Sequence, residues 1–290
     1  MRIGVVFPQT DIGADPEQVR AYAEAVEALG FTHLTSYDHV LGADPAAHAG
    51  FSGPYTAASM FHEPLVLYGY LAAVAPRLEL ATGIVILPQR QTALVAKQAA
   101  EVDILTGGHF RLGVGQGWNA VEYEALGTEF GNRGRRMEEQ IELLRRLWQE
   151  PVLTFEGRYH TITAAGINPP PVQRPIPIWM GGSSEPALKR IARLADGYFP
   201  LSRPLEGGWE ATFERMRGWR QKAGRDPDDL GIEARIDTAS GSPEEWRASA
   251  EEWRALGATH LSVNTMRDGL QGAEAHIHRL TEAQEALAGI

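Results

Sequence analysis

The chain has 290 residues, of which 43% are hydrophobic and 22% are charged, a composition typical of a globular protein rather than a disordered or fibrous one. Its net charge of -10, with no long basic run, argues against nucleic acid and anionic membranes as partners. The sequence has no cysteine, which excludes disulfides, thiolate nucleophiles and zinc–thiolate sites.

The N-terminal segment carries no sign of a targeting signal. Its sequence, "MRIGVVFPQT", has an apolar run of about five residues, too short for the hydrophobic region of a signal peptide. No stretch reaches the roughly 20 apolar residues of a membrane span. We therefore expect a cytoplasmic protein that does not associate with membranes.

Short apolar runs alternate with amphipathic helical patterns along the whole chain. Residues 3–8 predict a buried strand, and the next segment predicts a helix that begins after the N-cap Asp15 and ends at Gly30. Further strands are predicted at 31–37, 78–87, 109–115, 176–182, 197–201, 231–237 and 259–265. Further helices are predicted at 63–75, 93–105, 133–149, 185–194, 209–223, 243–256 and 272–287.

This order of elements predicts the fold. Strict alternation of strands and helices favours a parallel sheet, and about eight strand–helix pairs favour a closed barrel. The prediction is an α/β protein of the TIM (β/α)8 type, with an open doubly wound sheet as the alternative. No linker divides the chain, so residues 1–290 are predicted to form a single domain. Two insertions, near 41–60 and 151–174, are expected to cover the ligand-binding end.

Ligands of a parallel barrel bind at the carboxyl ends of its strands, so the residues that follow each strand are the candidates for a site. They are Pro8, Gln9, Asp38, His39, 87–90, 115–119, 181–184, 201–203, Asp237, Thr238, Asn264 and Thr265.

Glycines at alternate positions mark one of these strand ends, in "RLGVGQGWNAVEYEALG". Gly113, Gly115 and Gly117 let the backbone approach something closely, which is either a ligand or another segment of the chain. Trp118 is interpreted as a wall or lid. Asn119 either bonds a ligand or caps the next helix.

A second glycine motif, "MGGSSEPALKRIARLADG", joins a strand to a helix. The Gly181–Gly182 turn and the hydroxyls of Ser183 and Ser184 at a helix N-terminus suit a phosphate. The alternative is an ordinary capped helix with Ser184 as its N-cap.

The segment "SYDHV" places Asp38 beside His39 at the end of the second strand. Histidine moves protons near neutral pH, and a neighbouring carboxylate raises its basicity; the alternative is a structural turn. Gly83, inside "ATGIVIL", indicates a bulge or a close backbone approach. No histidine or glutamate group has metal-ligand spacing, and no G-x-S-x-G motif occurs.

Taken together, these segments resemble the bacterial luciferase-like monooxygenase superfamily, and most closely its F420-dependent oxidoreductase branch. The resemblance covers nearly the whole chain. It is carried by "SYDHV", "ATGIVILP", "VAKQAAEVDILTGGHFRLGVGQGWNAVEYEALG", "RGRRMEEQIELLRRLW" and "IPIWMGGSSEPALKRIARLADGYFP". The sequence departs from the family at His109, where relatives usually have arginine, and after Arg90, where a common proline is missing. Residues 40–42 lack an aromatic residue kept by some sugar-phosphate dehydrogenases, which argues against a sugar-phosphate substrate.

The resemblance implies a flavin or deazaflavin at the C-terminal mouth of the barrel. Family members often have a non-proline cis peptide bond at a bulge in the third strand, here near Gly83 and Ile84, where it would support the ring. Asp38 and His39 would flank the ring as catalytic residues, His39 moving the substrate proton and Asp38 orienting it. The residues expected to line the ring and hold its phosphate are Gly115, Gln116, Gly117, Asn119, Gly181, Gly182 and Ser183.

Coenzyme F420 is favoured over FMN, because the Asp–His pair and "GVGQGWN" look more like the F420 branch. Such an enzyme would transfer a hydride between C5 of F420 and a small organic substrate. The alternative within the family is an FMN-dependent monooxygenase that uses oxygen and receives its cofactor reduced by a flavin or F420 reductase partner. Other readings are a barrel that only carries flavin and a metal-dependent hydrolase.

Two further expectations come with the resemblance. The polyglutamate tail of F420 needs a basic groove, for which the candidates are Arg90, Arg133, Arg135 and Arg136. Family members are often dimers, so a homodimer is expected, built on the helices after the second and third strands. The candidates for that face, or for the core, are Phe61, Leu65, Leu67, Tyr68 and Leu71.

Overall fold

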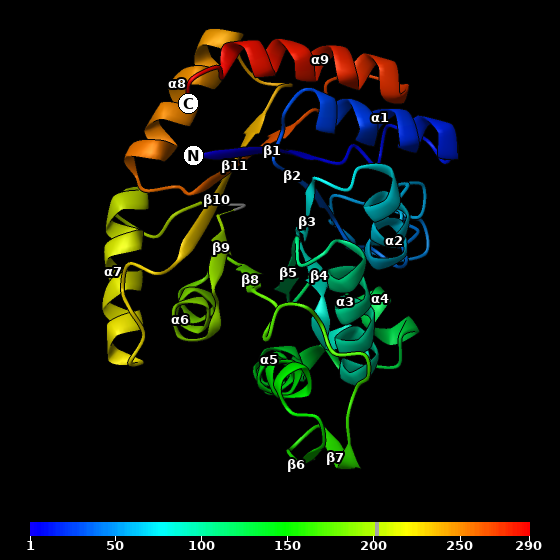
Figure 1. Cartoon of the computed structure of the whole chain (residues 1–290), viewed down its shortest axis with the longest axis vertical. Coiled ribbons are helices and arrows are strands. Elements are labelled where there is room, and N and C mark those ends of the chain that lie inside the picture. Colours follow the sequence, from blue (N-terminus) through cyan, green and yellow to red (C-terminus); the bar gives the residue numbers. More distant parts are fainter. Residues whose placement is uncertain (201–202) are drawn as a thin grey trace.

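The computed structural model describes residues 1–200 and 203–290, so Leu201 and Ser202, which the sequence analysis places at a strand end, lie outside this part. Figure 1 shows strands enclosed by helices. Each strand is parallel to its neighbours, and β11 pairs with β1. The strands follow one another around the ring as β1 (Arg2–Val6), β2 (His33–Ser36), β3 (Glu79–Thr82), β5 (Phe110–Gly115), β8 (Ile178–Gly181), β9 (Gly197–Phe199), β10 (Gly231–Asp237) and β11 (His260–Asn264).

The third position of the ring contains two strands rather than one. β3 pairs with both β2 and β5, and β4 (Val85–Ile86) continues along β5 after an interruption. The ring is therefore a closed barrel of eight parallel strand positions, and the predicted TIM-type α/β fold is confirmed.

Helices cover the outside of the barrel. They are α1 (Pro16–Ala28), α2 (Pro64–Val74), α3 (Thr92–Leu105), α5 (Arg133–Gln149), α6 (Glu185–Leu194), α7 (Gly208–Lys222), α8 (Pro243–Ala255) and α9 (Gly272–Ala286). As predicted, α1 follows the N-cap Asp15, whose Oδ1 accepts a hydrogen bond of 3.0 Å from the backbone N–H of Glu17. Within the described residues, none of the helices combines the length and apolarity of a bilayer crossing.

Three short helical elements lie in the connections. They are η1 (Leu87–Gln89) after β4, α4 (Ala120–Ala125) after β5, and η2 (Phe130–Asn132) before α5. The sequence analysis did not predict α4 as an element, although it considered Asn119 as a cap.

The first insertion folds back on itself beside the end of β2. Ala43 and Thr56 form an isolated bridge, and the backbone N–H of Ala57 donates to the carbonyl of Ala43 at 2.9 Å. A Cβ atom on Gly42 would lie 2.1 Å from the carbonyl oxygen of Thr56, so the close approach requires glycine. This insertion therefore has a defined shape next to the predicted mouth.

The second insertion is a hairpin of β6 (Leu153–Glu156) and β7 (Thr161–Ala165) that projects from the barrel (Figure 1). His160 in its turn lies 2.7 Å from Glu139 of α5 through Nδ1 and 2.8 Å from Thr92 of α3 through Nε2. None of its described residues lines the two cavities described below, so the expectation that it covers the ligand-binding end is wrong.

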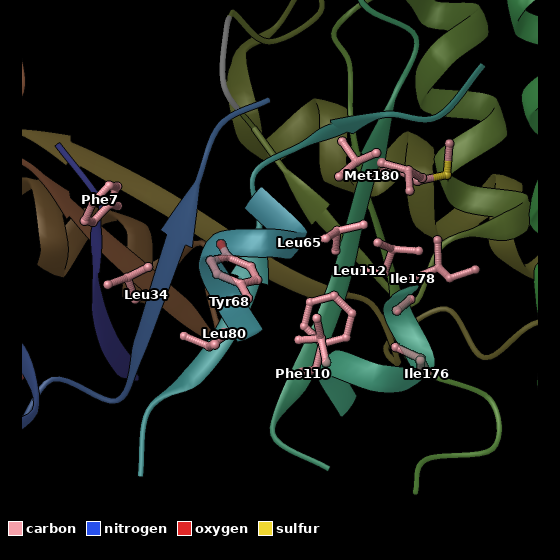
Figure 2. Close-up of a cluster of buried hydrophobic side chains, with 14 of the residues drawn as sticks. Phe7, Leu34, Leu65, Tyr68, Leu80, Phe110, Leu112, Ile176, Ile178 and Met180 are labelled. Atoms are coloured by element: carbon pink, nitrogen blue, oxygen red, sulfur yellow. The ribbon is translucent and has the colours of Figure 1, made fainter. Parts of the chain in front are cut away.

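Apolar side chains fill the space between the barrel and its helices. Figure 2 shows Tyr68 of α2 beside Leu80 and Phe110 of the strands, and Leu65 of the same helix belongs to this cluster. The ring of Tyr68 packs edge-on against Phe110 with centroids 6.3 Å apart. The candidate dimer-face residues of this helix are therefore core residues, namely Leu65, Leu67, Tyr68 and Leu71.

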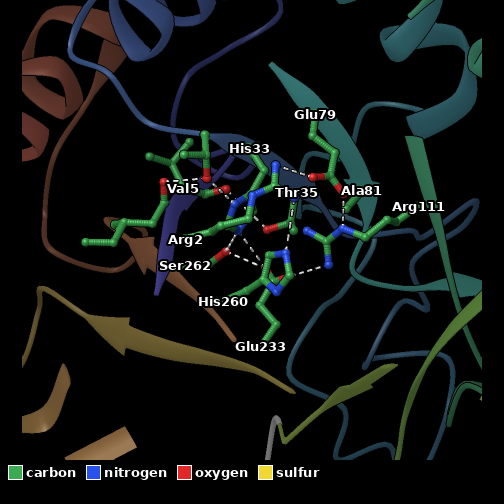
Figure 3. A network of polar contacts seen from close by, with 12 residues as sticks. Arg2, Val5, His33, Thr35, Glu79, Ala81, Arg111, Glu233, His260 and Ser262 are labelled. Atoms are coloured by element: carbon green, nitrogen blue, oxygen red, sulfur yellow. Dashed lines mark hydrogen bonds and ion pairs between the residues drawn. The ribbon is translucent and has the colours of Figure 1, made fainter. Parts of the chain in front are cut away.

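A buried charged network closes the N-terminal end of the barrel (Figure 3). Arg111 donates to Glu79 and, at 2.8 Å, to Glu233, which also accepts from Ser262 at 2.6 Å and contacts His33 at 3.2 Å. Burial raises the pKa of Glu233, but Arg111 and His33 outweigh it and hold that pKa well below its usual range. Because paired side chains fill the interior of the barrel at this end, the opposite end is the place to look for a ligand inside the ring of strands.

Candidate active site

The interruption of the third strand lies at the mouth of the barrel. The peptide bond between Gly83 and Ile84 is cis, at the position where the resemblance implied one. A Cβ atom on Gly115 would lie 2.5 Å from Cδ1 of Ile84, and one on Gly117 would lie 2.7 Å from Cγ2 of Ile86. These glycines therefore admit the side chains of the interrupted strand, which answers the question left open by the glycine motif.

The same glycines also border a cavity of about 400 Å³ at the carboxyl ends of β5 and β8. It brings together most of the predicted cofactor-binding residues, namely Ile84, Gly115, Gln116, Gly117, Gly181, Gly182 and Ser183. Trp118, Met137 and Met180 add apolar surface to its wall. As ligand contacts these residues remain predictions, but they share one cavity.

Gly83 and Asn119 do not line this cavity. Gly83 borders a small pocket inside the barrel, with Thr35 and Tyr37. Asn119 is buried and caps α4, because its Oδ1 accepts from the backbone N–H of Val121 at 3.2 Å. Its Nδ2 donates to the carbonyl of Leu41 at 3.2 Å, so Asn119 joins α4 to the first insertion.

The glycine turn before α6 forms one end of the cavity. Gly182 has a φ of 153°, and a Cβ atom there would lie 2.9 Å from Cβ of Ala187, so the turn requires glycine. Ser184 is the N-cap of α6, with its Oγ 3.4 Å from the backbone nitrogen of Ala187, and it also borders the cavity. The alternative interpretation of an ordinary capped helix is thus confirmed, and phosphate binding at this turn, which borders the cavity, stays a prediction.

Arg190 is a cavity residue that the sequence analysis missed. It follows Ala187 by three positions on the same face of α6, and both border the cavity. Its Nε donates to Glu138 of α5 at 2.7 Å, and only 14% of its side chain is exposed. A Cβ atom on Gly134 would lie 3.0 Å from Nη2 of Arg190, so glycine leaves room for the guanidinium. The sequence did contain a signal for Arg190: it lies on the helix that follows the glycine turn, three positions after Ala187 and so on the same helical face.

These walls fit a planar ring cofactor with a phosphate tail. Ile84, Met137 and Met180 offer apolar contacts for a ring, and the glycine turn with Arg190 offers donors for an anion. Across residues 1–200 and 203–290, no three histidine, aspartate or glutamate side chains are arranged to hold a metal ion.

His39 lies in an aromatic box beside this cavity. Its ring centroid is 4.8 Å from that of Phe61, 5.2 Å from Tyr55 and 5.4 Å from Trp118. His39, Tyr55 and Phe61 line a second, open cavity of about 260 Å³, which residues of the first insertion border. Trp118 borders the larger cavity and packs on His39, so it stands between the two.

The carboxylate that faces His39 is Glu122 rather than Asp38. Its Oε2 lies 3.5 Å from Nδ1 of His39, and its Oε1 accepts from the backbone N–H groups of Val40 and Leu41, the latter at 3.2 Å. Burial raises the pKa of Glu122, but the bonds from His39, Val40 and Leu41 outweigh burial and lower it below its usual value. A buried carboxylate with a lowered pKa therefore lies in ion-pair contact with Nδ1 of the imidazole, and the same histidine lines the smaller cavity.

Asp38 has a different role from the predicted one. Its carboxylate accepts from Nη2 of Arg90 at 2.7 Å and from the backbone N–H of Ile86 at 2.9 Å, and no bond to His39 occurs within the described residues. Burial raises the pKa of Asp38, and Arg90 opposes that shift. Because Arg90 also donates to Glu63 at 3.0 Å, it is engaged inside the fold and does not serve a polyglutamate tail.

The other candidate arginines lie at the start of α5, next to the cavity residue Met137. The guanidinium of Arg133 lies 3.7 Å from the ring centroid of Phe130. Arg135 is exposed and Arg136 is half-buried. These three arginines do not line the larger cavity, and Arg190 is the one arginine among its described lining residues.

This barrel, with a ring-sized cavity and a histidine at its mouth, has the architecture of an enzyme that binds a cofactor at the strand ends. The sequence model described as luciferase-like monooxygenase matches residues 1–289. The chain belongs to the luciferase-like monooxygenase family, and it is a flavin- or deazaflavin-dependent oxidoreductase or monooxygenase.

Two relatives each match about 70% of this chain. The uncharacterized protein Rv0940c of Mycobacterium tuberculosis is 35% identical over 216 residues, which are 70% of this chain and 71% of that protein. The FMNH(2)-dependent dimethylsulfone monooxygenase of Pseudomonas fluorescens is 33% identical over 202 residues, which are 69% of this chain and 51% of that protein.

Two solved structures share the fold over almost the whole chain. Monooxygenase RslO1 from Streptomyces bottropensis has a TM-score of 0.79 at 21% identity and covers 99% of this chain and 98% of its own. An F420-dependent secondary alcohol dehydrogenase has a TM-score of 0.78 at 17% identity with the same coverage. Proteins similar to this chain thus use either FMN or F420.

Proposed function

We propose that the protein is an F420-dependent oxidoreductase that transfers a hydride between C5 of the deazaflavin and a small organic substrate. The observation that carries the proposal is the position of His39, which Glu122 holds 3.5 Å away beside the wall between two cavities. Interconversion of an alcohol and a carbonyl moves a hydride at carbon and a proton at oxygen, so it needs a proton-transfer group next to the cofactor site.

Bound F420 supplies or accepts the hydride, which is chemistry of the cofactor and not of the chain. The chain would hold its ring against Ile84 and Met180, and its phosphate at the turn around Gly182. Nε2 of His39 would take the proton from the substrate oxygen or return it, and the ionised Glu122 would stabilise the imidazolium.

Basic residues around the larger cavity support F420 over FMN. Arg190 lies in its wall, and Arg133, Arg135 and Arg136 lie at the start of α5 beside Met137. FMN ends in one phosphate, whereas F420 continues into a polyglutamate tail. We propose that the tail runs over these arginines.

The second candidate is an FMN-dependent monooxygenase that uses reduced flavin and oxygen, with a flavin reductase as partner. The 33% identity to an FMNH(2)-dependent dimethylsulfone monooxygenase favours it. The glycine turn and Arg190 suit the phosphate of either cofactor, so this end of the cavity does not distinguish the two.

We also propose a cytoplasmic homodimer. Val66 of α2 and Leu94 of α3 are 71% and 51% exposed, and these helices follow the second and third strands. Such side chains would be covered by a second copy. Sedimentation of the wild-type protein should give twice the monomer mass. The Val66→Glu variant should give the mass of a monomer.

The deciding experiment is a titration of the purified protein with F420 and with FMN, followed by an oxygen-electrode measurement with each reduced cofactor. The proposal expects tight binding of F420 without oxygen consumption. Tight binding of FMN together with substrate-dependent oxygen consumption would establish the monooxygenase instead.

A further inference from the structure

We propose that the β6–β7 hairpin, none of whose described residues lines either cavity, positions the wall of the cofactor site through Gln140 of α5. Gln140 lines neither cavity in the described part of the chain, so it is a positioning residue that acts through its neighbours. The inference rests on the proposed function only in requiring a cofactor ring in the larger cavity, with either F420 or FMN as the cofactor. It goes beyond that function by giving a role to an insertion outside the site.

Gln140 is fully buried, and its side-chain amide holds the segment that follows β4. Its Nε2 donates to the carbonyl of Leu87 at 3.1 Å, to the carbonyl of Arg90 at 3.2 Å and to Oγ1 of Thr92 at 2.9 Å. A primary amide has two N–H groups, so these three acceptors use all of its donors. Leu87 begins η1 and Arg90 is its C-cap, so one side chain holds both ends of this turn.

The turn held in this way is joined to the wall of the larger cavity. The guanidinium of Arg90 donates to Asp38 at 2.7 Å, and Asp38 accepts from the backbone N–H of Ile86 at 2.9 Å. Ile86 packs closely on Gly117, where a Cβ atom would lie 2.7 Å from its Cγ2, and both Gly117 and Ile84 line the cavity. A displacement of η1 would therefore move the surface on which the ring is expected to rest.

The tip of the hairpin is built around one carboxylate of α5, that of Glu139. Its oxygens accept from the backbone N–H groups of Arg158 at 2.7 Å and Tyr159 at 2.9 Å, and one of them lies 2.7 Å from Nδ1 of His160. A Cβ atom on Gly157 would lie 2.6 Å from Cδ of Glu139, so glycine allows the close approach. Because β7 is mostly exposed, these polar contacts fix the tip against α5.

His160 completes the connection from the hairpin to Gln140. Its Nε2 lies 2.8 Å from Oγ1 of Thr92, the oxygen that accepts from Gln140. Burial lowers the pKa of His160, so the imidazole is neutral near pH 7. With its proton on Nδ1 toward Glu139, the imidazole accepts from the Thr92 hydroxyl through Nε2, and every contact in the chain has one donor and one acceptor.

The amide of Gln140 is not needed to pack α5 on the barrel. Ile141 and Leu144 of the same helix are fully buried and belong to the hydrophobic core. Burying an amide costs free energy of dehydration, which its hydrogen bonds roughly offset. The effect of Gln140 is therefore on where η1 lies rather than on how tightly α5 packs.

The test compares two variants of this chain of contacts with a matched control. Gln140→Met removes the donors with little change of volume, and His160→Phe keeps a planar ring that cannot form the two hydrogen bonds. Leu144→Ala is the control, because this buried side chain lies on the same helix and its loss lowers the overall stability. Amide hydrogen exchange is followed by NMR, without cofactor, at Ile86 and at Val263 of β11 as the reference.

Gln140→Met should speed exchange at Ile86 about tenfold relative to Val263, because several hydrogen bonds are lost. His160→Phe should give a smaller increase, and the double variant should equal Gln140→Met, because the histidine acts through the glutamine. Leu144→Ala should leave the ratio of the two exchange rates unchanged. An unchanged ratio in Gln140→Met, an equal change in Leu144→Ala, or additive effects of Gln140→Met and His160→Phe would overturn the inference.

A spectroscopic measurement extends the test to the cofactor. The visible circular dichroism of bound FMN or F420 reports the surroundings of the ring, so Gln140→Met should change it and Leu144→Ala should not. The Kd values for FMN and riboflavin should rise by the same factor, about three- to tenfold, because the ring wall is altered and the phosphate end is not. An unchanged spectrum, or a loss of affinity confined to FMN, would contradict the positioning role.

The two measurements also separate this inference from the proposed function. Failure of both cofactors to bind the wild type would refute the proposed function. The exchange ratio is measured without cofactor, so it decides by itself whether the hairpin and Gln140 position the strand.

Discussion

Replacing Arg190 by alanine should remove one contact to the cofactor phosphate, whichever of the two cofactors binds. The guanidinium is 14% exposed and is fixed by Glu138 at 2.7 Å, so little ordering is needed before it meets an anion. A hydrogen bond from a charged group is worth about 1.5–3 kcal/mol. A loss of about 2 kcal/mol corresponds to a Kd about thirty-fold higher.

The assay is a fluorescence titration with two matched ligand pairs: FMN with riboflavin, and F420 with its phosphate-free deazaflavin. Arg190→Ala should weaken only the phosphate-bearing member of each pair. Arg193→Ala is the control, because Arg193 also donates to Glu138 but is 51% exposed and does not line the cavity. Equal losses for FMN and riboflavin, or equal effects of the two variants, would refute the assignment of Arg190 to the phosphate.

Three further predictions concern the proton-transfer group, the glycine turn and the closed end of the barrel. In steady-state kinetics, His39→Ala should lower turnover by roughly 100-fold while the affinity for the cofactor stays unchanged. Glu122→Gln should lower turnover by a smaller factor and shift the pH profile of kcat/KM. Gly182→Ala should lower the free energy of unfolding by about 1–3 kcal/mol in urea titrations, since its φ of 153° and the 2.9 Å approach to Ala187 both oppose a side chain. Burial, with Arg111 nearby, lowers the pKa of His260 from 6.5 to about 3, so the unfolded chain binds more protons than the folded chain between these values. The free energy of unfolding should therefore rise as the pH is raised from about 3 to 6.5 and fall as the pH is lowered through this window, and His260→Gln should flatten this slope in urea titrations at several pH values.

Most of the fold could be predicted because each element carries its own signal. Asp15 caps the first helix and Gly30 ends it, with a φ of 84° that glycine accepts. The rule that ligands bind at the carboxyl ends of parallel strands then places distant residues together. Gly115 and Gly181 end β5 and β8, which are neighbours in the barrel, and both line the larger cavity.

Side-chain partners were harder to predict, because sequence neighbours in an extended segment point to opposite sides. Asp38 and His39 are adjacent in the chain, yet one faces Arg90 and the other faces Glu122. Glu122 did leave a signal: it stands three residues after the cap Asn119, where an acidic side chain usually reaches back to the cap. Its partners, however, are His39, Val40 and Leu41, which lie between the end of β2 and the start of the first insertion, in a segment whose path no periodicity encodes.

The two residues of "SYDHV" nevertheless act together, though not as a dyad. Asp38 accepts from the backbone N–H of Ile86, which follows the cis bond, so it fixes the strand whose Ile84 lines the larger cavity. His39, the next residue, lines the smaller cavity. The end of β2 therefore contributes to the walls of both cavities, through the bond from Asp38 to the backbone beside Ile84 and through the ring of His39.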